Sequence, residues 1–323
     1  MDWLKNKTDV LVTAFRDSPI WSSLAVVGAC VLVRHTLCAL NSVWKYLLRP
    51  GKDLYKTYGG PNTWAIVTGG SSGIGLAYAK LLAKAGFNLI LIARNPEKLE
   101  EKKQEILKEK VPASCAIETV CFDFCKPYTP ESYQPIVQAL NGKEIAILVN
   151  NVGADHACEF YEYTPEALSE MINVNVNATT FLTWIVIPQM MKRAVRRSAV
   201  INISSCFTEA YMPNFNVYIA TKAYINALMR CLYEELKKEK IDVLTTLTGE
   251  VSTPRNPMKS MWHASADSVA HGQVSALGKE AETYGGFRHL FYTRYLQSCI
   301  SGRFKKWLGT TARSLTLASI KKA

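Results

Sequence analysis

The sequence lacks several features that would place it in other classes of protein. It contains no Cys-X-X-Cys pair, no internal repeat and no low-complexity segment. Its nine cysteines are odd in number, which argues against a disulfide framework and for a reducing compartment, and no metal site is predicted. No nucleic-acid-binding motif accompanies the net charge of +11. Membrane lipid and a phosphorylated cofactor are therefore the expected anionic partners, and nucleic acid is not.

One apolar stretch is long enough to cross a membrane. As a helix, Ile20–Leu40 would rise about 30 Å, close to the thickness of a hydrocarbon core. Trp21 and Trp44 bracket it, as aromatic residues do at membrane interfaces. Arg34 opposes insertion, but an arginine near one end can extend its head group to the interface. A membrane anchor is predicted, with an in-plane amphipathic helix or hairpin, a buried helix and a cleaved signal as alternatives.

The charges that follow this stretch predict its orientation. A single acid, Asp53, stands among five basic residues: Arg34, Lys45, Arg49, Lys52 and Lys56. Because basic residues are retained on the cytoplasmic side of membranes, the large domain that follows is expected in the cytosol. The endoplasmic reticulum membrane is the expected location, and a mitochondrial membrane is the alternative.

A glycine-rich turn follows the first predicted strand. The strand is Thr63–Thr68, the turn reads TGGSSGIG over Thr68–Gly75, and a helical pattern continues to Gly86. Strand, turn and helix in this order place free backbone N–H groups at a helix N-terminus, where they bind the pyrophosphate of a dinucleotide. The predicted cofactor contacts in this turn are Gly69, Ser71, Ser72, Gly73, Ile74 and Gly75.

The end of the second predicted strand, Asn88–Arg94, indicates which dinucleotide is used. An acidic residue there would bind the ribose hydroxyls of NAD and repel a 2′-phosphate. The sequence has Arg94 instead, whose guanidinium can grip a phosphate through two hydrogen bonds. NADP(H) is therefore predicted. Asn95 is expected to cap a charged helix that runs to about Lys110.

Further strands alternate with helices along the chain. Cys115–Phe124 and Glu144–Asn151 are predicted strands, with a helix near Glu131–Leu140 between them. Asp123 is placed to meet the adenine amino group. This alternation predicts an α/β fold with a doubly wound parallel sheet, and the cofactor is expected across the carboxyl ends of its strands.

Three polar residues in the second half suggest acid–base chemistry. Tyr218 and Lys222 are four apart, so they share one face of a helix. Lowering the tyrosine pKa from about 10 to near 7 takes roughly 4 kcal/mol, which an ammonium about 4 Å away can supply. Ser205 lies at the end of the apolar strand AVINIS. We therefore expect Lys222 to lower the pKa of Tyr218.

These elements, in order TGxxxGxG, NNxG, Ser and YxxxK, resemble the short-chain dehydrogenase/reductase family from about Thr63 to Val251. The resemblance implies that Tyr218 donates a proton to a carbonyl oxygen, that Ser205 binds this oxygen and that Lys222 binds the nicotinamide ribose. It also implies that Asn175, chosen over Asn173 and Asn177 by its spacing, holds a water molecule. The further cofactor contacts implied are Asn150, Val152, Gly153, Val251 and Thr253.

The resemblance also predicts the organisation of the chain. The expected fold is a Rossmann-type doubly wound parallel sheet with an N-terminal membrane helix and a C-terminal helical extension. The predicted segments are an N-terminal segment (1–19), an anchor helix (20–46), a linker (47–62), the Rossmann domain (63–255) and a substrate lid with a basic extension (256–323). An interfacial aromatic-basic stretch is the alternative to the lid.

Two departures from the family pattern affect the expected site. Thr248 replaces a proline that often follows the sixth strand, so the rigidity of the loop that holds the carboxamide is in question. The stretch SSCFTEAYMP after the serine strand has less glycine than in many relatives and could narrow the substrate pocket.

A finer resemblance concerns the substrate. YGGPNTWAIVTG, LILIARNPEKL, ILVNNVG and NISS are similar to the membrane-bound 3-ketoacyl-CoA reductases and 17β-hydroxysteroid dehydrogenases. The resemblance implies NADPH-dependent reduction of a 3-oxoacyl-CoA in fatty-acid elongation, or of a steroid ketone as the alternative. A catalytically silent structural subunit is the alternative of another class. A homo-oligomer or a membrane complex is a further expectation.

Overall fold

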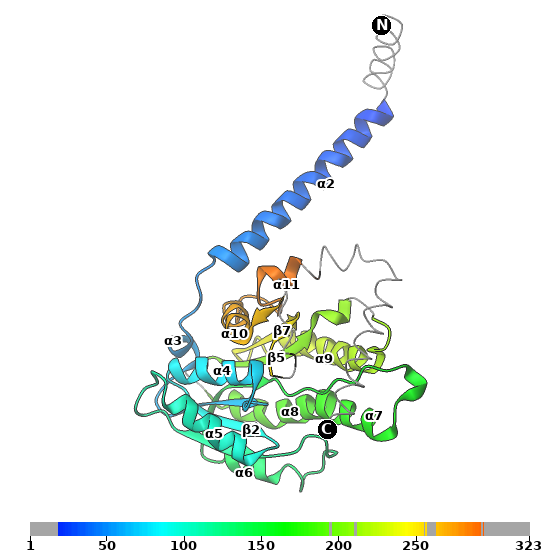
Figure 1. Cartoon of the computed structure of the whole chain (residues 1–323). Helices are drawn as coiled ribbons and strands as arrows, with labels where there is room; N and C mark the ends of the chain where they lie inside the picture. Colours follow the sequence, from blue (N-terminus) through cyan, green and yellow to red (C-terminus); the bar gives the residue numbers. More distant parts are fainter. Residues whose placement is uncertain are drawn as a thin grey trace, which may run out of the picture. The chain divides into compact units, whose positions relative to one another are not determined.

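The computed structural model describes residues 19–193, 196–209, 212–254, 256, 263–291 and 293. Residues up to Arg49 and residues from Pro50 onward form separate compact units (Figure 1). In the first unit, the helix α2 (Pro19–Val43) continues into the π-helix η1 (Trp44–Leu48). The apolar helix Ile20–Leu48 is long enough and apolar enough to cross a membrane, and its most apolar part is not buried. An N-terminal apolar helix is thus present, as predicted.

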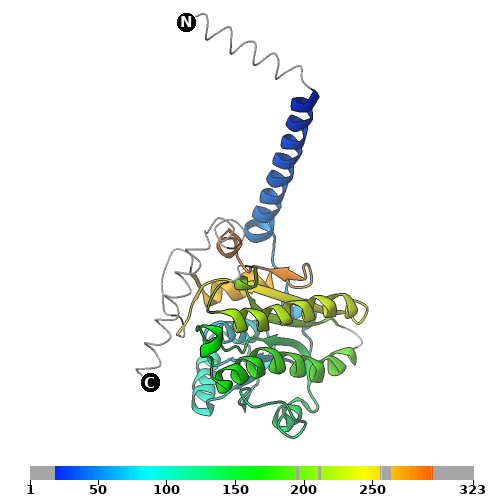
Figure 2. The same ribbon diagram turned by 90° about the vertical axis from the view of Figure 1, so that its right-hand side faces the viewer.

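The second unit is built on a parallel sheet with helices on both faces (Figures 1 and 2). The strand order is β3-β2-β1-β4-β5-β6-β9, and every neighbouring pair runs parallel. The strands are β1 (Thr63–Thr68), β2 (Asn88–Ala93), β3 (Ile117–Cys121), β4 (Glu144–Asn150), β5 (Ser198–Ser205), β6 (Ile241–Thr248) and β9 (Glu282–Thr283). A small second sheet pairs β7 (Val251–Ser252) with β8 (Ala264–Ser265). The predicted doubly wound fold is confirmed.

The helices lie between the strands along the chain. They are α3 (Leu54–Tyr58), α4 (Gly73–Lys84), α5 (Pro96–Leu107), α6 (Gln134–Leu140), α7 (Pro165–Met171), α8 (Ala178–Met191), α9 (Asn216–Glu235), α10 (Ala266–Val274) and α11 (Phe287–Phe291). Between them lie the 3₁₀ turns η2 (Phe160–Glu162) and η4 (Cys206–Glu209) and the π-helix η3 (Ile172–Asn177). Asn95 accepts a hydrogen bond from the Lys98 backbone, which confirms it as the cap of α5.

Neighbouring residues of a strand pack into two different hydrophobic cores. Val67 of β1 packs in one core with Leu82 of α4, whereas its neighbour Ile66 packs in the other with Leu182 of α8. All four side chains are fully buried. Because both faces of the parallel sheet are covered, its strands read as continuous apolar runs rather than as alternating ones.

Two predicted boundaries differ from the structure. Residues 47–62, expected to be a linker, contain α3, whose Tyr58 is completely buried. The Tyr58 hydroxyl donates to Asp242 Oδ2 at 2.7 Å, so a contact distant in sequence keeps this segment on the domain. The third strand is Ile117–Cys121 and is shorter than the expected Cys115–Phe124. Phe122 and Phe124 are buried, although they lie outside the strand.

Candidate active site

The glycine-rich turn joins β1 to α4 through backbone conformations that favour glycine. Gly69 and Gly73 have φ values of 65° and 54°, in the left-handed region. A Cβ at Gly75 would lie 2.4 Å from the Gly69 carbonyl oxygen, and one at Gly73 would lie 3.2 Å from Thr253 Cγ2. The turn is therefore a cradle that added side chains would fill, and it brings Thr253 beside the glycines. A dinucleotide pyrophosphate fits such a cradle at the start of a helix.

Thr68 connects the glycine turn to the next strand end. Its hydroxyl accepts hydrogen bonds from the backbone N–H groups of Asn151 and Val152 at 2.9 and 3.0 Å. Asn151 Nδ2 donates in return to the Thr68 carbonyl at 2.9 Å. Thr68 and Asn151 were included in the sequence motifs but not among the predicted site residues. The structure shows that this pair fixes the position of the NNVG segment relative to the glycine turn.

Asn150 has a different environment from the one expected of a cofactor contact. It is 2% exposed, and its Nδ2 donates to Thr183 Oγ1 of α8 at 2.8 Å. This hydrogen bond connects β4 to α8. Gly153 lies on the site side, because a Cβ there would be 3.5 Å from both Lys222 Nζ and Asn175 Oδ1.

Arg94 and Asp123 follow two neighbouring strands, β2 and β3. Arg94 is exposed, and its Nη1 lies 3.8 Å from Cys125 Sγ. Asp123 is partly buried, and its Oδ1 accepts from the Cys125 backbone N–H at 3.1 Å. A pocket of about 630 Å³ opens beside Arg94 and is also lined by Cys125, His156, Glu166, Ala167, Ser169 and Glu170. Arg94 therefore has room to meet an anionic ligand.

The structure brings together Ser205 at the end of β5 and Tyr218 and Lys222 on α9. Lys222 is buried, its Nζ donates to the Ile203 carbonyl at 2.9 Å, and it lies 6.0 Å from the centroid of the Tyr218 ring. Ser205 Oγ accepts from the Phe207 backbone N–H at 3.2 Å. A proton donor, a second hydroxyl and a cation thus lie together at the carboxyl end of the sheet.

Asn175 lies in the π-helix η3 and is 1% exposed. Its Oδ1 accepts from the Ala154 N–H, and its Nδ2 donates to the Ala154 carbonyl, both at 2.8 Å. Nδ2 also donates to Thr221 Oγ1 at 3.0 Å, which places the amide next to the α9 turn that holds Lys222. The neighbouring Asn173 binds the Cys125 carbonyl, and Asn177 binds Asn173. Asn175 is therefore the asparagine of this segment that reaches α9.

The electrostatics of Tyr218 differ from the expectation. Burial raises the pKa of Tyr218 above its usual value, Asp155 raises it further, and a hydrogen bond from Ser205 opposes the shift. The expected lowering of the Tyr218 pKa is therefore wrong as a net effect, because desolvation of the phenol is the largest cause and raises the pKa. The Lys222 ammonium donates a hydrogen bond to the Ile203 carbonyl.

The loop after β6 is held by hydrogen bonds in place of the expected proline. Thr248 Oγ1 accepts from Gln273 Nε2 of α10 at 2.8 Å, and Gln273 Oε1 accepts from the Tyr78 hydroxyl of α4 at 2.8 Å. His289 of α11 accepts from the Gly249 N–H at 3.3 Å, and burial lowers the pKa of its imidazole. These hydrogen bonds hold the loop after β6, whose rigidity is in question because Thr248 replaces a proline.

The rest of this loop continues into β7. Val251 is buried in β7, and the Thr253 backbone N–H donates to the Asn256 carbonyl at 3.0 Å. More than half of the predicted lid and basic extension (256–323) lies outside the described residues. Within the described part of the chain, no group of three or more His, Cys, Asp or Glu side chains is placed to hold a metal ion.

Comparisons with known proteins agree with this geometry. Residues 63–264 match the short chain dehydrogenase family. The chain is 34% identical over 247 residues to the very-long-chain 3-oxoacyl-CoA reductase of Coprinopsis cinerea, with 75% of this chain and 71% of the relative covered. It is 31% identical over 317 residues to the inactive hydroxysteroid dehydrogenase-like protein 1 of Pongo abelii, with 93% and 91% covered.

A solved structure is also similar. It is a short-chain dehydrogenase from Sphingobium yanoikuyae in complex with NADPH, with 26% sequence identity and a TM-score of 0.59. The match covers 66% of this chain and 84% of that one.

Proposed function

Because the chain belongs to the short-chain dehydrogenase family, whose members are NAD(P)-dependent oxidoreductases acting on CH–OH and C=O groups, we propose that it uses NADPH to reduce the 3-oxo group of a long-chain acyl-CoA. The observation that carries this proposal is the convergence of Ser205, Tyr218 and Lys222 at the carboxyl end of the sheet, beside the glycine cradle. Reduction needs a hydride and a proton at one carbonyl. When bound, the reduced nicotinamide supplies the hydride.

The chain's own residues supply the proton and hold the reacting groups. Tyr218 donates its proton to the carbonyl oxygen, and its raised pKa keeps the phenol in the proton-donating form at neutral pH. Ser205 donates a hydrogen bond to the same oxygen and stabilises the charge that develops on it. Lys222 holds the nicotinamide ribose, and Asn175 positions a water molecule near it. The pyrophosphate is held at the glycine turn.

The choice of NADP(H) depends on the end of β2. Arg94 is exposed there and faces a pocket, whereas a carboxylate would repel a 2′-phosphate. The NADPH complex of the related short-chain dehydrogenase supports this choice. Asp123, Val152, Gly153, Val251 and Thr253 complete the proposed cofactor contacts.

The substrate class follows from the relatives and from the N-terminal helix. A relative of 34% identity is named a very-long-chain 3-oxoacyl-CoA reductase. An exposed apolar helix suits an enzyme whose substrate partitions into lipid. We place the chain in the endoplasmic reticulum membrane with its catalytic domain in the cytosol, and a mitochondrial membrane is the alternative.

Two other functions are each favoured by one observation. A steroid ketone would enter the same site and would suit the same anchor. A catalytically silent subunit is favoured by the relative named inactive hydroxysteroid dehydrogenase-like protein 1, which aligns over 93% of this chain. The presence of Ser205, Tyr218 and Lys222 in one site supports activity over silence.

The test is NADPH oxidation by the full chain in mild detergent. A long-chain 3-oxoacyl-CoA and estrone are compared as substrates, with Tyr218→Phe as the control. We expect oxidation with the acyl-CoA, and a loss of at least about 100-fold in the variant, because the proton donor is removed. NADPH binding should persist in the variant.

Each other result has a defined meaning. Turnover with estrone alone would assign the steroid function. NADPH that binds but is not consumed by either substrate would favour the silent subunit. A failure to bind NADPH would contradict the catalytic proposal itself.

A further inference from the structure

A second pocket lies at the end of the sheet opposite the proposed active site. It has a volume of about 830 Å³ and adjoins the first residues of β4 and the turn before β1. Strands of this length separate it from the glycine turn by about 20 Å. Its lining residues are Gly60, Pro61, Leu140, Asn141, Gly142, Lys143, Glu144, Gln189, Lys192, Arg193 and Arg196. Four of these side chains are basic and one is acidic.

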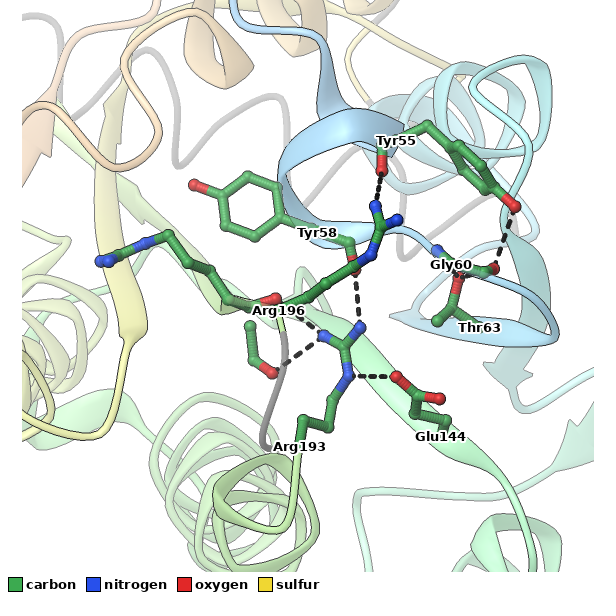
Figure 3. A network of polar contacts seen from close by, with 9 residues as sticks. Tyr55, Tyr58, Gly60, Thr63, Glu144, Arg193 and Arg196 are labelled. Carbon is green, nitrogen blue, oxygen red and sulfur yellow. Dashed lines mark hydrogen bonds and ion pairs between the residues drawn. The ribbon is translucent and has the colours of Figure 1, made fainter.

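Arg193 forms the rigid wall of this pocket (Figure 3). Its side chain is 3% exposed, and its Nε donates to Glu144 Oε1 at 2.8 Å. Its Nη2 donates to the Tyr58 carbonyl at 2.8 Å, and its Nη1 donates to the Arg197 carbonyl at 2.7 Å. Every nitrogen of this guanidinium donates a hydrogen bond, and Glu144 is paired with it. Arg193 therefore contributes shape to the pocket, and the lone acid does not oppose an anionic ligand.

The other basic side chains of the pocket make fewer hydrogen bonds than Arg193 does. Arg196 is exposed, and its Nη1 donates a long hydrogen bond of 3.4 Å to the Tyr55 carbonyl (Figure 3). The same Nη1 donates a second long hydrogen bond, of 3.3 Å, to the Lys56 carbonyl. Lys192 is exposed, and its ammonium has no partner among the described residues. Lys143 pairs with Glu118 at 3.1 Å. The pocket therefore presents an arginine fork and a lysine around one cavity, a combination that binds phosphate.

The segment that Arg196 contacts follows closely after the apolar helix in the sequence. Residues 49–53 join the end of η1 to the start of α3, and they can span at most about 20 Å. The carbonyls that Arg196 contacts belong to α3 itself. Five residues of chain therefore separate the segment that Arg196 contacts from the end of the apolar helix.

We propose that the pocket binds the phosphate of an anionic phospholipid headgroup through Lys192 and Arg196. The cytoplasmic face of membranes is rich in such headgroups, and each cation near them strengthens association about fivefold. Headgroup binding at this end of the sheet orients the domain on the membrane. The site is independent of the reaction proposed above, since it lies at the other end of the strands.

The test uses the full chain in a neutral detergent with dioctanoyl phosphatidic acid as the probe. Binding is measured by thermophoresis, and the shift in unfolding temperature gives a second readout. The pocket variant is K192Q/R196Q. The matched control, K108Q/K110Q, removes the same charge from exposed lysines after α5, outside the pocket. Dioctanoyl phosphatidylcholine and inorganic phosphate serve as the other ligands.

We expect K192Q/R196Q to weaken phosphatidic acid binding about 25-fold, and the control to change it less than twofold. The charge-keeping variant K192R/R196K should bind phosphatidic acid more tightly than K192Q/R196Q does. Equal weakening in the pocket and control variants, or none in either, would overturn the site. Inorganic phosphate or phosphatidylcholine binding as tightly as phosphatidic acid would overturn the assignment to an anionic headgroup. NADPH binding should be the same in all variants.

Discussion

Tyr218 and Lys222 lie one helical turn apart, yet their side chains have different interactions in the structure. The lysine ammonium is directed to the Ile203 carbonyl, and the phenol is dominated by its own burial. Helical spacing brings two residues to one face, but it does not fix the direction of a flexible side chain. The neighbouring strand β5 contributes to that direction, because its Ile203 carbonyl accepts a hydrogen bond from the ammonium.

The raised pKa of Tyr218 predicts how reduction depends on pH. A raised pKa keeps the phenol protonated up to at least its usual value near pH 10, so the proton donor is present throughout the neutral range. We expect the rate of a single reductive turnover, with NADPH bound beforehand, to change less than twofold between pH 6 and 9.

The measurement is a stopped-flow pH series, corrected for any loss of folded protein. A tenfold fall between pH 7 and 9 would contradict the prediction. It would mean that Lys222 lowers the pKa of the phenol in the working enzyme.

At the scale of elements, a buried polar chain ties α4, α10 and β6 together. Gln273 is completely buried and bridges the Tyr78 hydroxyl to Thr248 Oγ1. Thr248 also lies 3.2 Å from Thr246 Oγ1. The bridge fixes the start of the loop that is proposed to hold the cofactor. A threonine can replace a proline here because its hydroxyl has a partner on the neighbouring helix.

Replacing Gln273 with leucine tests this bridge. The change leaves the Tyr78 hydroxyl without its acceptor and Thr248 without its donor, and we expect a loss of about 2–4 kcal/mol in the free energy of unfolding. Denaturant unfolding measures the loss, and NADPH titration should show weaker binding.

The control is the double variant Tyr78→Phe/Gln273→Leu. It removes both partners of one hydrogen bond, so it should recover part of the stability that the single change loses. Equal stability of Gln273→Leu and the unmodified chain would show that the bridge does not support the loop.

At the scale of the whole molecule, the chain divides into an apolar helix and a folded domain, each compact by itself. The helix from Ile20 to Leu48 exposes large apolar side chains such as Leu32 and Leu37, which are 70% and 61% exposed. Exposure on this scale disfavours the alternative of a buried helix. A lipid environment would remove these apolar side chains from water.

Alkaline carbonate extraction of membranes from expressing cells distinguishes a spanning helix from an in-plane one. We expect more than about nine-tenths of the full chain to stay in the membrane pellet, because a spanning helix is held by its whole apolar surface. A peripheral protein and an integral protein of the same membrane serve as controls. Release into the supernatant would contradict the spanning anchor and favour the in-plane helix.

Several features of this protein follow from local sequence patterns. The apolar runs with their turns and caps predicted the α/β order, and TGGSSGIG predicted the glycine cradle, because backbone geometry follows from neighbouring residues. YIATK placed Tyr218 and Lys222 on one helical face in the same way. The prediction of a linker at residues 47–62 differs from the structure, because Tyr58 binds Asp242, which is 184 residues away in the sequence.

Other features depend on partners that are distant in the sequence and meet only in the folded chain. Gln273 supports Thr248 across 25 residues, and Arg193 reaches the Tyr58 carbonyl across 135. Burial reversed the expected pKa shift of Tyr218, since desolvation depends on everything packed around the ring. The second pocket, proposed to bind a headgroup phosphate, likewise combines segments that meet at the amino ends of the strands. No local sequence pattern predicts that these segments lie together.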